Sequence, residues 1–285
     1  MQIAKMSAAI NSSNLLGEFP SASQVLAEIA NAATPTESPN AETNRIQLTD
    51  SHCHLDFPIF DADREAVLAR AQAEGVERFL VMGISAAQWP RLFALAQQYS
   101  SWRMAFGLHP YFLRDRIQNR EPTFADFADD LALLPTFLEK GALAVGEIGL
   151  DATQPLFELQ VELFKKQLHI AADMNLPVIL HHRKTLDKML PMVKKAGVSS
   201  GIVHAFSGSY QQAMQWVDAG FRIGVGGVIT YPRAQKTRAA IAKVPLESLV
   251  LETDSPDMPL FGNQGNRNEP ADIAKIAHAL ILLRE

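Results

Sequence analysis

Two histidines separated by a single residue stand in the segment Asp50-Ser-His-Cys-His54. Side chains two positions apart in a β-strand project from the same face, so His52 and His54 would point together while Cys53 points away. Two imidazoles at this spacing can bind one metal ion. The motif alone is weak evidence, because histidines paired in this way are often only surface or hydrogen-bonded residues.

Other ionisable residues follow further β-rich segments of the chain. These are His109, Glu147, His181, His204 and Asp254. In a barrel of parallel strands, the carboxyl ends of all strands surround one mouth, where such enzymes place their chemistry. Polar groups without partners at that mouth would each cost on the order of a few kcal/mol in desolvation, and a shared cation offsets this cost. The residue types therefore predict a metal site formed by His52, His54, Glu147, His181, His204 and Asp254.

Eight short apolar segments must position these residues, and longer amphipathic segments separate them. The predicted strands cover 46–53, 77–83, 104–108, 142–148, 178–181, 201–204, 221–227 and 248–253, and the predicted helices cover 63–74, 86–99, 157–174, 186–196, 210–219 and 233–242. This alternation implies a parallel sheet with right-handed crossovers. Eight units in about 240 residues predict an α/β fold of the (β/α)8 TIM-barrel type, with a doubly wound open sheet as the alternative.

The overall composition fits a soluble globular protein. Of 285 residues, 47% are apolar and 20% are charged, and the net charge is −5. This charge excludes the global basic field of proteins that package nucleic acid, although a nuclease can gain positive charge locally and from metal ions. The single cysteine, Cys53, excludes an intramolecular disulfide and is typical of the reducing cytoplasm. No apolar run reaches the roughly 18 residues that would span a membrane.

The composition changes at about residue 46. Residues 1–45 are rich in Ala, Ser, Thr, Asn and Pro and lack the continuous apolar stretch of a secretory signal. We expect a disordered or linker-like extension over residues 1–45, with a short helix over 23–33, followed by one barrel domain over residues 46–285.

Five motifs in this order resemble the signatures of the TatD family, which comprises metal-dependent deoxyribonucleases of the amidohydrolase superfamily. They are Asp50-Ser-His-Cys-His54, Val145-Gly-Glu-Ile-Gly-Leu-Asp151, Pro177-Val-Ile-Leu-His-His-Arg183, Gly201-Ile-Val-His-Ala-Phe-Ser-Gly208 and Leu251-Glu-Thr-Asp-Ser-Pro256. The resemblance runs from about residue 48 to the end of the chain. Two departures from the family pattern are the extension over residues 1–45 and an end at Glu285, inside the last predicted helix, where relatives continue.

The resemblance implies a site with two divalent cations (Mg²⁺, Mn²⁺ or Zn²⁺). His52, His54 and Asp254 would hold one ion and His181 with His204 the other, while Glu147 would bridge them. Asp254, Glu147 and His204 would be the catalytic residues. Asp254 would accept the proton of the metal-activated water, and His204 would lie near the phosphoryl oxygens. His182 occupies the variable position of the family motif and points to the opposite strand face, so it is expected to pack there or to support a ligand.

Several residues near the predicted mouth have two interpretations. His109 contacts the substrate phosphate or fixes its own loop by a hydrogen bond, and Arg183 binds phosphate or forms a salt bridge. Asp151 supports a ligand or caps the next helix. Tyr231 and Arg233 lie after the seventh strand, where barrels often bind phosphate, or they only pack their loop.

The expected function is that of a metal-dependent hydrolase, a TatD-type deoxyribonuclease that cleaves phosphodiester bonds of single-stranded DNA or frayed ends. We expect a cytoplasmic monomer that binds no membrane. One alternative keeps the site and changes the bond, as in an esterase or amidase such as a D-aminoacyl-tRNA deacylase. A second alternative is a metal-binding barrel without catalytic activity.

Overall fold

A computed structural model describes residues 47–285, so the expected extension over residues 1–45 lies outside the described residues. Between residues 47 and 285, eight strands alternate with eight α-helices. The strands are β1 (Leu48–Cys53), β2 (Val76–Gly83), β3 (Trp102–Phe106), β4 (Ala144–Asp151), β5 (Val178–Arg183), β6 (Gly201–Val203), β7 (Phe221–Val225) and β8 (Leu249–Leu251). The helices are α3 (Arg64–Ala73), α4 (Trp89–Ala96), α5 (Ala128–Leu138), α6 (Phe157–Asp173), α7 (Leu186–Ala196), α8 (Tyr210–Val217), α9 (Gln235–Ile241) and α10 (Ile273–Arg284).

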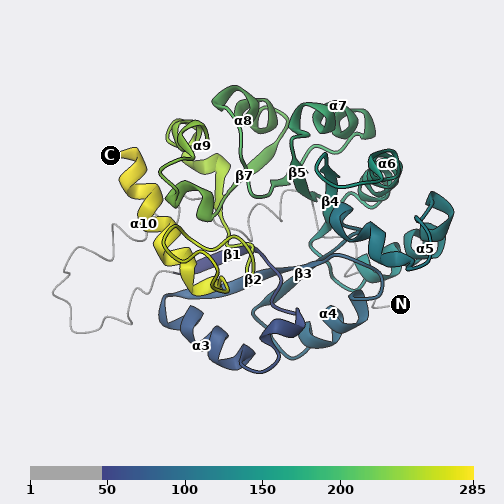
Figure 1. Cartoon of the computed structure of the whole chain (residues 1–285), viewed down its shortest axis with the longest axis horizontal. Helices are drawn as coiled ribbons and strands as arrows, with labels where there is room; N and C mark the ends of the chain where they lie inside the picture. Colours follow the sequence, from purple (N-terminus) through teal and green to yellow (C-terminus); the bar gives the residue numbers. More distant parts are fainter. Residues whose placement is uncertain (1–46) are drawn as a thin grey trace, which may run out of the picture.

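The strands form one parallel sheet in the order of the chain, from β1 to β8. Backbone hydrogen bonds close the sheet between its two ends: His54 N donates to Ser255 O at 2.8 Å, and Asp254 N donates to His52 O at 2.9 Å. Helices surround the closed sheet (Figure 1). The predicted TIM barrel is confirmed, and the sequential strand order excludes the doubly wound sheet.

All eight predicted strands are present, with ends that differ by a few residues. His109, His204 and Asp254 lie one to three residues beyond the ends of β3, β6 and β8, in the loops of the mouth. Helix α5 was not predicted from the sequence. Its apolar positions Leu134, Phe137 and Leu138 are buried, but Pro135 interrupts the segment and weakens the helical signal.

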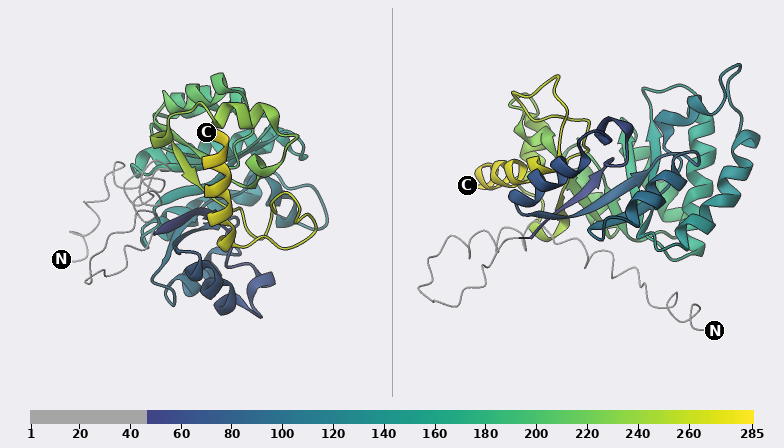
Figure 2. Two further views of the ribbon diagram at one scale, coloured as in Figure 1. Left: turned by 90° about the vertical axis from the view of Figure 1, so that its left-hand side faces the viewer. Right: turned by 90° about the horizontal axis from the view of Figure 1, so that it is seen from below.

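Apolar side chains pack on both faces of the barrel sheet, one layer inside the barrel and one between the sheet and the helices. Leu80 and Met82 of β2 belong to a small buried cluster inside the barrel, whereas Phe79 and Val81 belong to the larger core between sheet and helices. This alternation is the period of two that a strand imposes on its side chains. The side view shows the barrel strands enclosed by helices along their length (Figure 2). Within residues 47–285, no helix combines the length and the apolar character needed to cross a bilayer.

Two buried glutamines of α6 hold the backbone at the ends of neighbouring strands. Gln167 Oε1 accepts from Leu108 N at 2.6 Å, and its Nε2 donates to Leu108 O at 3.2 Å. Gln160 makes the same pair of bonds with Asp151, at 2.8 and 3.2 Å. The two glutamines are seven residues apart and therefore share one helix face. Helix α6 thus fixes the backbone immediately before His109 and at Asp151.

Strands β4 and β5 approach too closely for a side chain at position 149. A Cβ atom on Gly149 would lie 1.9 Å from the carbonyl oxygen of His181, and Gly149 has a positive φ of 154°. We expect Gly149→Ala to lower the free energy of unfolding by about 3 kcal/mol, at the upper end of the usual cost of overpacking, because a backbone collision forces the strands apart. The midpoint of urea unfolding measures this change.

Gly141→Ala is the matched control for that substitution. Gly141 also has a positive φ, of 97°, but an added Cβ would meet no atom within 4 Å. Its replacement should cost only about 1–2 kcal/mol, from backbone strain alone. Equal losses in the two variants would contradict the proposed collision.

Candidate metal centre

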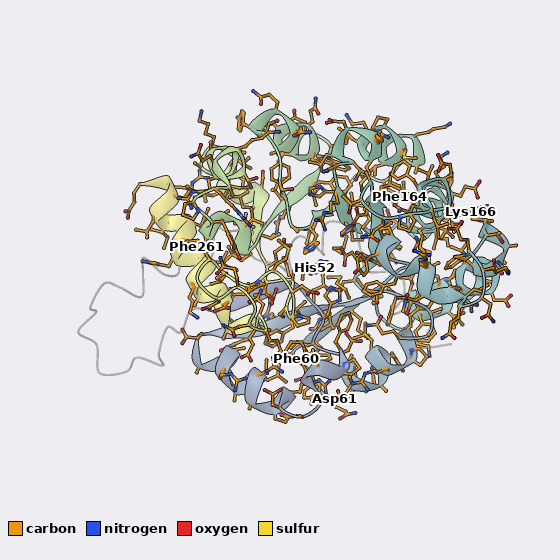
Figure 3. The ribbon with its side chains drawn as sticks, in the orientation of Figure 1. His52, Phe60, Asp61, Phe164, Lys166 and Phe261 are labelled. Atoms are coloured by element: carbon orange, nitrogen blue, oxygen red, sulfur yellow. The ribbon has the colours of Figure 1, made fainter. Side chains whose placement is uncertain are left out.

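The mouth of the barrel contains a cavity of about 760 Å³ at the carboxyl ends of the strands. Figure 3 shows His52 at the middle of the ring of helices, whereas Phe164 and Lys166 of α6 lie toward its outside. Seven of the eight predicted site residues line this cavity, namely His54, His109, Glu147, His181, Arg183, His204 and Asp254. His52 is fully buried beneath it.

Glu147 of β4 presents its two oxygens to different groups of histidines. Oε2 lies 3.1 Å from Nε2 of His52 and 3.7 Å from Nε2 of His54. Oε1 lies 3.1 Å from Nε2 of His109 and 3.1 Å from Nδ1 of His181. The carboxylate is almost completely buried between the two groups, as a bridging ligand would be.

Asp254 faces three imidazoles from the opposite side of the mouth. Its Oδ1 atom lies 3.6 Å from Nε2 of His52, 3.4 Å from Nε2 of His54 and 3.5 Å from Nε2 of His204. The side chain of Asp254 is 18% exposed, compared with 2% for Glu147. Asp254 is therefore the carboxylate of this pair that a substrate can approach.

Glu252 joins the cluster although it was not predicted from the sequence. Its Oε1 accepts from Ala205 N at 2.6 Å, and its Oε2 lies 3.2 Å from Nδ1 of His204. Gly224 of β7 makes room for this buried carboxylate, because a Cβ there would lie 2.4 Å from it. The available sequence signal was its position directly after β8, at the end of a strand like the other residues of the mouth.

The donor atoms of the mouth fit a divalent cation. Nitrogens and oxygens bound to one ion at about 2.1 Å stand roughly 3.0–3.4 Å apart, close to the separations found here. Nδ1 of His52 and His54 is buried without a hydrogen-bond partner within residues 47–285, so Nε2 of each ring is the atom that faces the carboxylates. In the part of the chain that the structure describes, three sets of donors are close enough to hold an ion: His52, His54 and Asp254; His109, Glu147 and His181; His52, His204 and Glu252.

These sets contain all six predicted ligands, but His204 is grouped with His52 and Glu252 and not with His181 as predicted. The ring of His204 stacks on that of His52, with centroids 3.4 Å apart, and its nearest carboxylates are Glu252 and Asp254. His181 instead faces Glu147. The joint binding of one ion by His181 and His204 stays a prediction.

Burial and neighbouring groups set the charges of the cluster. Burial alone would raise the pKa of Glu147, but the nearby imidazoles of His109 and His52 outweigh it and hold that pKa well below its usual range. Burial would also raise the pKa of Asp254, but the neighbouring histidines, chiefly His204, outweigh burial and hold that pKa well below its usual value. Burial would lower the pKa of His204, but Glu252 and Asp254 raise it well above its usual value. Glu147 and Asp254 are therefore ionised at neutral pH.

His109 acts as a hydrogen-bond donor to Glu147. Its Nδ1 accepts from Tyr111 N at 3.0 Å, so the proton of the neutral ring is on Nε2, 3.1 Å from Glu147 Oε1. Burial lowers the pKa of His109 to about 4, which keeps the ring neutral. Neither nitrogen then offers a free lone pair to a metal. His109 thus makes the predicted loop hydrogen bond and also orients the central carboxylate.

Asp151 supports His181. Its Oδ2 lies 3.3 Å from His181 Nε2, while its Oδ1 accepts from Thr153 N at 2.8 Å and from Thr153 Oγ1 at 2.6 Å. Helix α6 begins at Phe157 and has no side-chain cap, so the interpretation of Asp151 as a helix cap is wrong. A carboxylate that fixes a histidine ring in this way is common around metal ligands.

The remaining predicted residues divide between the cavity and its surroundings. Arg183 is exposed, lines the cavity and forms no ion pair with any residue of the described part of the chain. His182 is buried, with its ring centroid 6.1 Å from that of Phe206, and it also lines the cavity. Tyr231 donates its hydroxyl to Pro259 O at 2.7 Å, and the guanidinium of Arg233 lies 5.4 Å from the Tyr231 ring, which supports the loop-packing interpretation.

We expect Glu252→Gln to weaken metal binding by about 10–100-fold. The carboxylate near Nδ1 favours the His204 tautomer with its proton on Nδ1, which leaves the Nε2 lone pair for a cation. An amide NH₂ group in that position would favour the opposite tautomer. Calorimetric titration with Mn²⁺ measures the change, and Glu247→Gln, at an exposed position before β8, is the control. Unchanged affinity in Glu252→Gln would show that Glu252 only holds the Ala205 backbone.

The chain is similar to known metal-dependent hydrolases over most of its length. Residues 49–285 match the family model described as TatD related DNase. The chain is 46% identical over 238 residues to the metal-dependent hydrolase YjjV of Escherichia coli K12, covering 82% of this chain and 89% of that protein. It is 39% identical over 248 residues to a metal-dependent hydrolase of Haemophilus influenzae, covering 82% and 91%.

Solved structures agree with these matches. The crystal structure of the E. coli TatD homologue YjjV superposes with a TM-score of 0.74 at 45% identity, covering 84% of this chain and 91% of that one. A TatD-family hydrolase from Entamoeba histolytica has the same fold, with a TM-score of 0.71 at 21% identity and coverage of 84% and 91%.

Proposed function

Because the chain belongs to the TatD family of metal-dependent hydrolases, we propose that it is a deoxyribonuclease that hydrolyses phosphodiester bonds of DNA. The proposal includes two divalent cations, of Mg²⁺, Mn²⁺ or Zn²⁺, as cofactors. Imidazole-rich ligation favours Mn²⁺ or Zn²⁺ over Mg²⁺. DNA with single-stranded or frayed ends is the proposed substrate.

One observation carries this proposal. Glu147 turns one oxygen toward His52 and His54 and the other toward His181, so a single carboxylate faces two groups of possible ligands. Such an arrangement suits two cations a few ångströms apart, which can act on both oxygens of an in-line displacement at phosphorus. A site that only binds one ion would not need the second group of ligands.

Asp254 is the proposed general base. Bound cations would lower the pKa of a water molecule and stabilise negative charge on the phosphoryl group. Asp254 is ionised and reaches the cavity, so its carboxylate can take the proton that the attacking water loses. Glu147 is too deeply buried for that task and keeps the ligands in place. Nε2 of His204 lies 3.5 Å from Asp254 Oδ1, so a cation held by this nitrogen would lie close to the negative charge that develops on the phosphoryl group.

Arg183 is the proposed contact to the phosphate backbone. Its guanidinium is exposed at the cavity and is not neutralised by an ion pair within residues 47–285. A planar guanidinium can bind a phosphate through two hydrogen bonds. This local charge can attract DNA to a chain whose net charge is −5.

A substrate panel tests the proposed activity. The full chain is purified without chelator, loaded with Mg²⁺, Mn²⁺ or Zn²⁺, and given single-stranded DNA with a 3′ or 5′ label, double-stranded DNA, D-aminoacyl-tRNA and simple aryl esters. We expect cleavage of the DNA, fastest with single-stranded ends. Hydrolysis of the aminoacyl ester with no cleavage of DNA would overturn the proposal in favour of a deacylase.

A further inference from the structure

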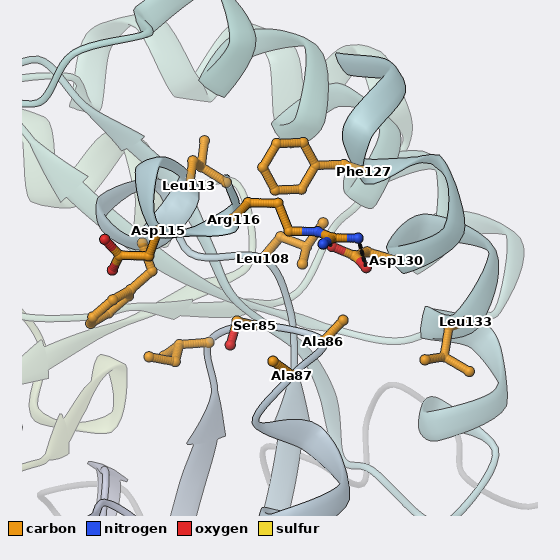
Figure 4. Close-up of a pocket in the computed structure, with 12 residues that line it drawn as sticks. Ser85, Ala86, Ala87, Leu108, Leu113, Asp115, Arg116, Phe127, Asp130 and Leu133 are labelled. Atoms are coloured by element: carbon orange, nitrogen blue, oxygen red, sulfur yellow. Dashed lines mark hydrogen bonds and ion pairs between the residues drawn. The ribbon is translucent and has the colours of Figure 1, made fainter. Parts of the chain in front are cut away.

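A second cavity, of about 480 Å³, lies beside the metal centre, and we refer to it as the side cavity. Figure 4 shows Ser85, Ala86 and Ala87 on one side of it and Leu113 and Phe127 on the other. Leu108, Leu113 and Phe127 are almost fully buried, whereas Leu133 at the cavity is 40% exposed. The side cavity is therefore closed at its apolar base and open to solvent at one edge.

The side cavity adjoins the proposed reaction site through one short segment. Leu108 lines the side cavity, and the next residue, His109, contacts Glu147 of the metal centre. Phe112 lines both cavities, and its ring centroid is 5.4 Å from that of His109. A ligand group held in the side cavity would thus be the neighbour of a group held at the metal centre.

Four polar side chains, Ser85, Asp115, Arg116 and Asp130, line the side cavity, and the last two hold each other in position. Arg116 donates from Nε to Asp130 Oδ2 at 2.9 Å and from Nη2 to Asp130 Oδ1 at 3.3 Å (Figure 4). Its Nη1 has no hydrogen-bond partner within the described residues, so it remains a donor for a ligand. Ser85 adds a hydroxyl group. An apolar cavity of this size with a small number of oriented polar groups is typical of a site for a small molecule.

We propose that the side cavity binds the nucleobase of the nucleotide whose phosphate is bound at the metal centre. A nucleobase is flat and heteroaromatic, so its faces suit apolar and aromatic walls while its edge accepts hydrogen bonds from Arg116 or Ser85. The choice of a nucleotide as the ligand rests on the proposed deoxyribonuclease function. The side cavity in turn supports DNA over a simple ester as the substrate. DNA carries a base beside every phosphate, whereas a simple ester has no group that would fill an apolar cavity next to the phosphate site.

The test compares two ligands that differ only in the base. The affinities of 2′-deoxyadenosine 5′-monophosphate and 2-deoxyribose 5-phosphate for the full chain loaded with Mn²⁺ are measured by calorimetry. Both carry the same phosphate for the metal centre. We expect the nucleotide to bind at least about ten-fold more tightly, in line with the energy of base stacking on apolar side chains. Equal affinities would overturn the proposal.

Filling the side cavity should remove this preference. Ala87 is exposed and lines the side cavity, so Ala87→Phe places a ring there without disturbing the core. We expect nucleotide binding to fall by about ten-fold while sugar phosphate binding stays unchanged. Ala66→Phe, at an exposed position of α3, is the matched control. Leu133→Asp, at the open edge, is a second variant and should show the same selective loss. Equal weakening of both ligands would overturn the proposal.

Cleavage of DNA is measured separately on the same preparations. A wild-type chain that prefers the nucleotide but cleaves no DNA would support the side cavity and overturn the proposed nuclease activity. A chain that cleaves DNA but binds the two ligands equally would overturn the side cavity alone.

Discussion

Replacement of Glu147 by glutamine is expected to reduce the number of bound divalent ions from two per chain to one and to lower DNA hydrolysis by at least about 100-fold. The physical reason is electrostatic. Two divalent ions about 3.5–4 Å apart repel each other, and the negative charge between them offsets that repulsion. Glutamine keeps the size of the side chain and removes the charge. Elemental analysis and the rate on single-stranded DNA measure the two effects.

The hydrogen bonds of Glu147 make this substitution specific. His109 donates to Oε1, so a glutamine would keep its carbonyl oxygen there and turn its NH₂ group toward His52 and His54. An NH₂ group cannot act as a metal ligand in that position. Glu158→Gln, at an exposed position of α6, is the control and should leave both metal content and rate unchanged. Two ions retained by Glu147→Gln would contradict the bridging role.

Replacement of Asp254 by asparagine is expected to lower kcat by about 10²–10⁴-fold, the usual contribution of a general base. The amide still offers an oxygen to His52, His54 and His204 but cannot accept the proton of water. Metal should bind more weakly yet remain measurable, which separates the loss of the base from the loss of the site. The single-turnover rate at saturating Mn²⁺ measures the effect.

Asp218→Asn provides the control for that experiment, because Asp218 is exposed at the end of α8 and does not line the cavity of the mouth. The control should retain the wild-type rate. If Asp254→Asn kept more than about a tenth of the wild-type rate with metal bound, Asp254 would be a ligand only, and another group would have to accept the proton.

The barrel could be predicted because its signals are local. Each strand is a short apolar segment of its own, and the period of two in β1 brings His52 and His54 together without any knowledge of the rest of the fold. The clustering of His52, Glu147 and Asp254 then follows from topology, since parallel strands end at one mouth.

Glu252, Gln160 and the side cavity depend on contacts between distant segments, which the sequence alone does not indicate. Glu252 is a buried carboxylate because Gly224, on the neighbouring strand, leaves it space. Nothing in the sequence pattern of α6 distinguishes Gln160 from other polar residues of a helix. Only the structure shows that its side chain accepts a hydrogen bond from the backbone of Asp151. The side cavity is formed by loops after β2 and β3 together with α5, a helix that its internal proline concealed.

Hydrogen bonds from two glutamines of α6 connect this outer helix to the backbone at the mouth of the barrel. The rates of hydrogen–deuterium exchange of the bonded amides would measure this connection. The amide protons of Leu108 and Asp151 are held by Gln167 and Gln160, so neither can exchange with solvent until α6 moves away from the sheet. Their exchange should therefore be slow and should follow that of α6 itself. The loop that carries His109 and the end of β4 at Asp151 would then open and close as one cooperative unit, governed by a helix on the far side of the sheet from the proposed phosphate site.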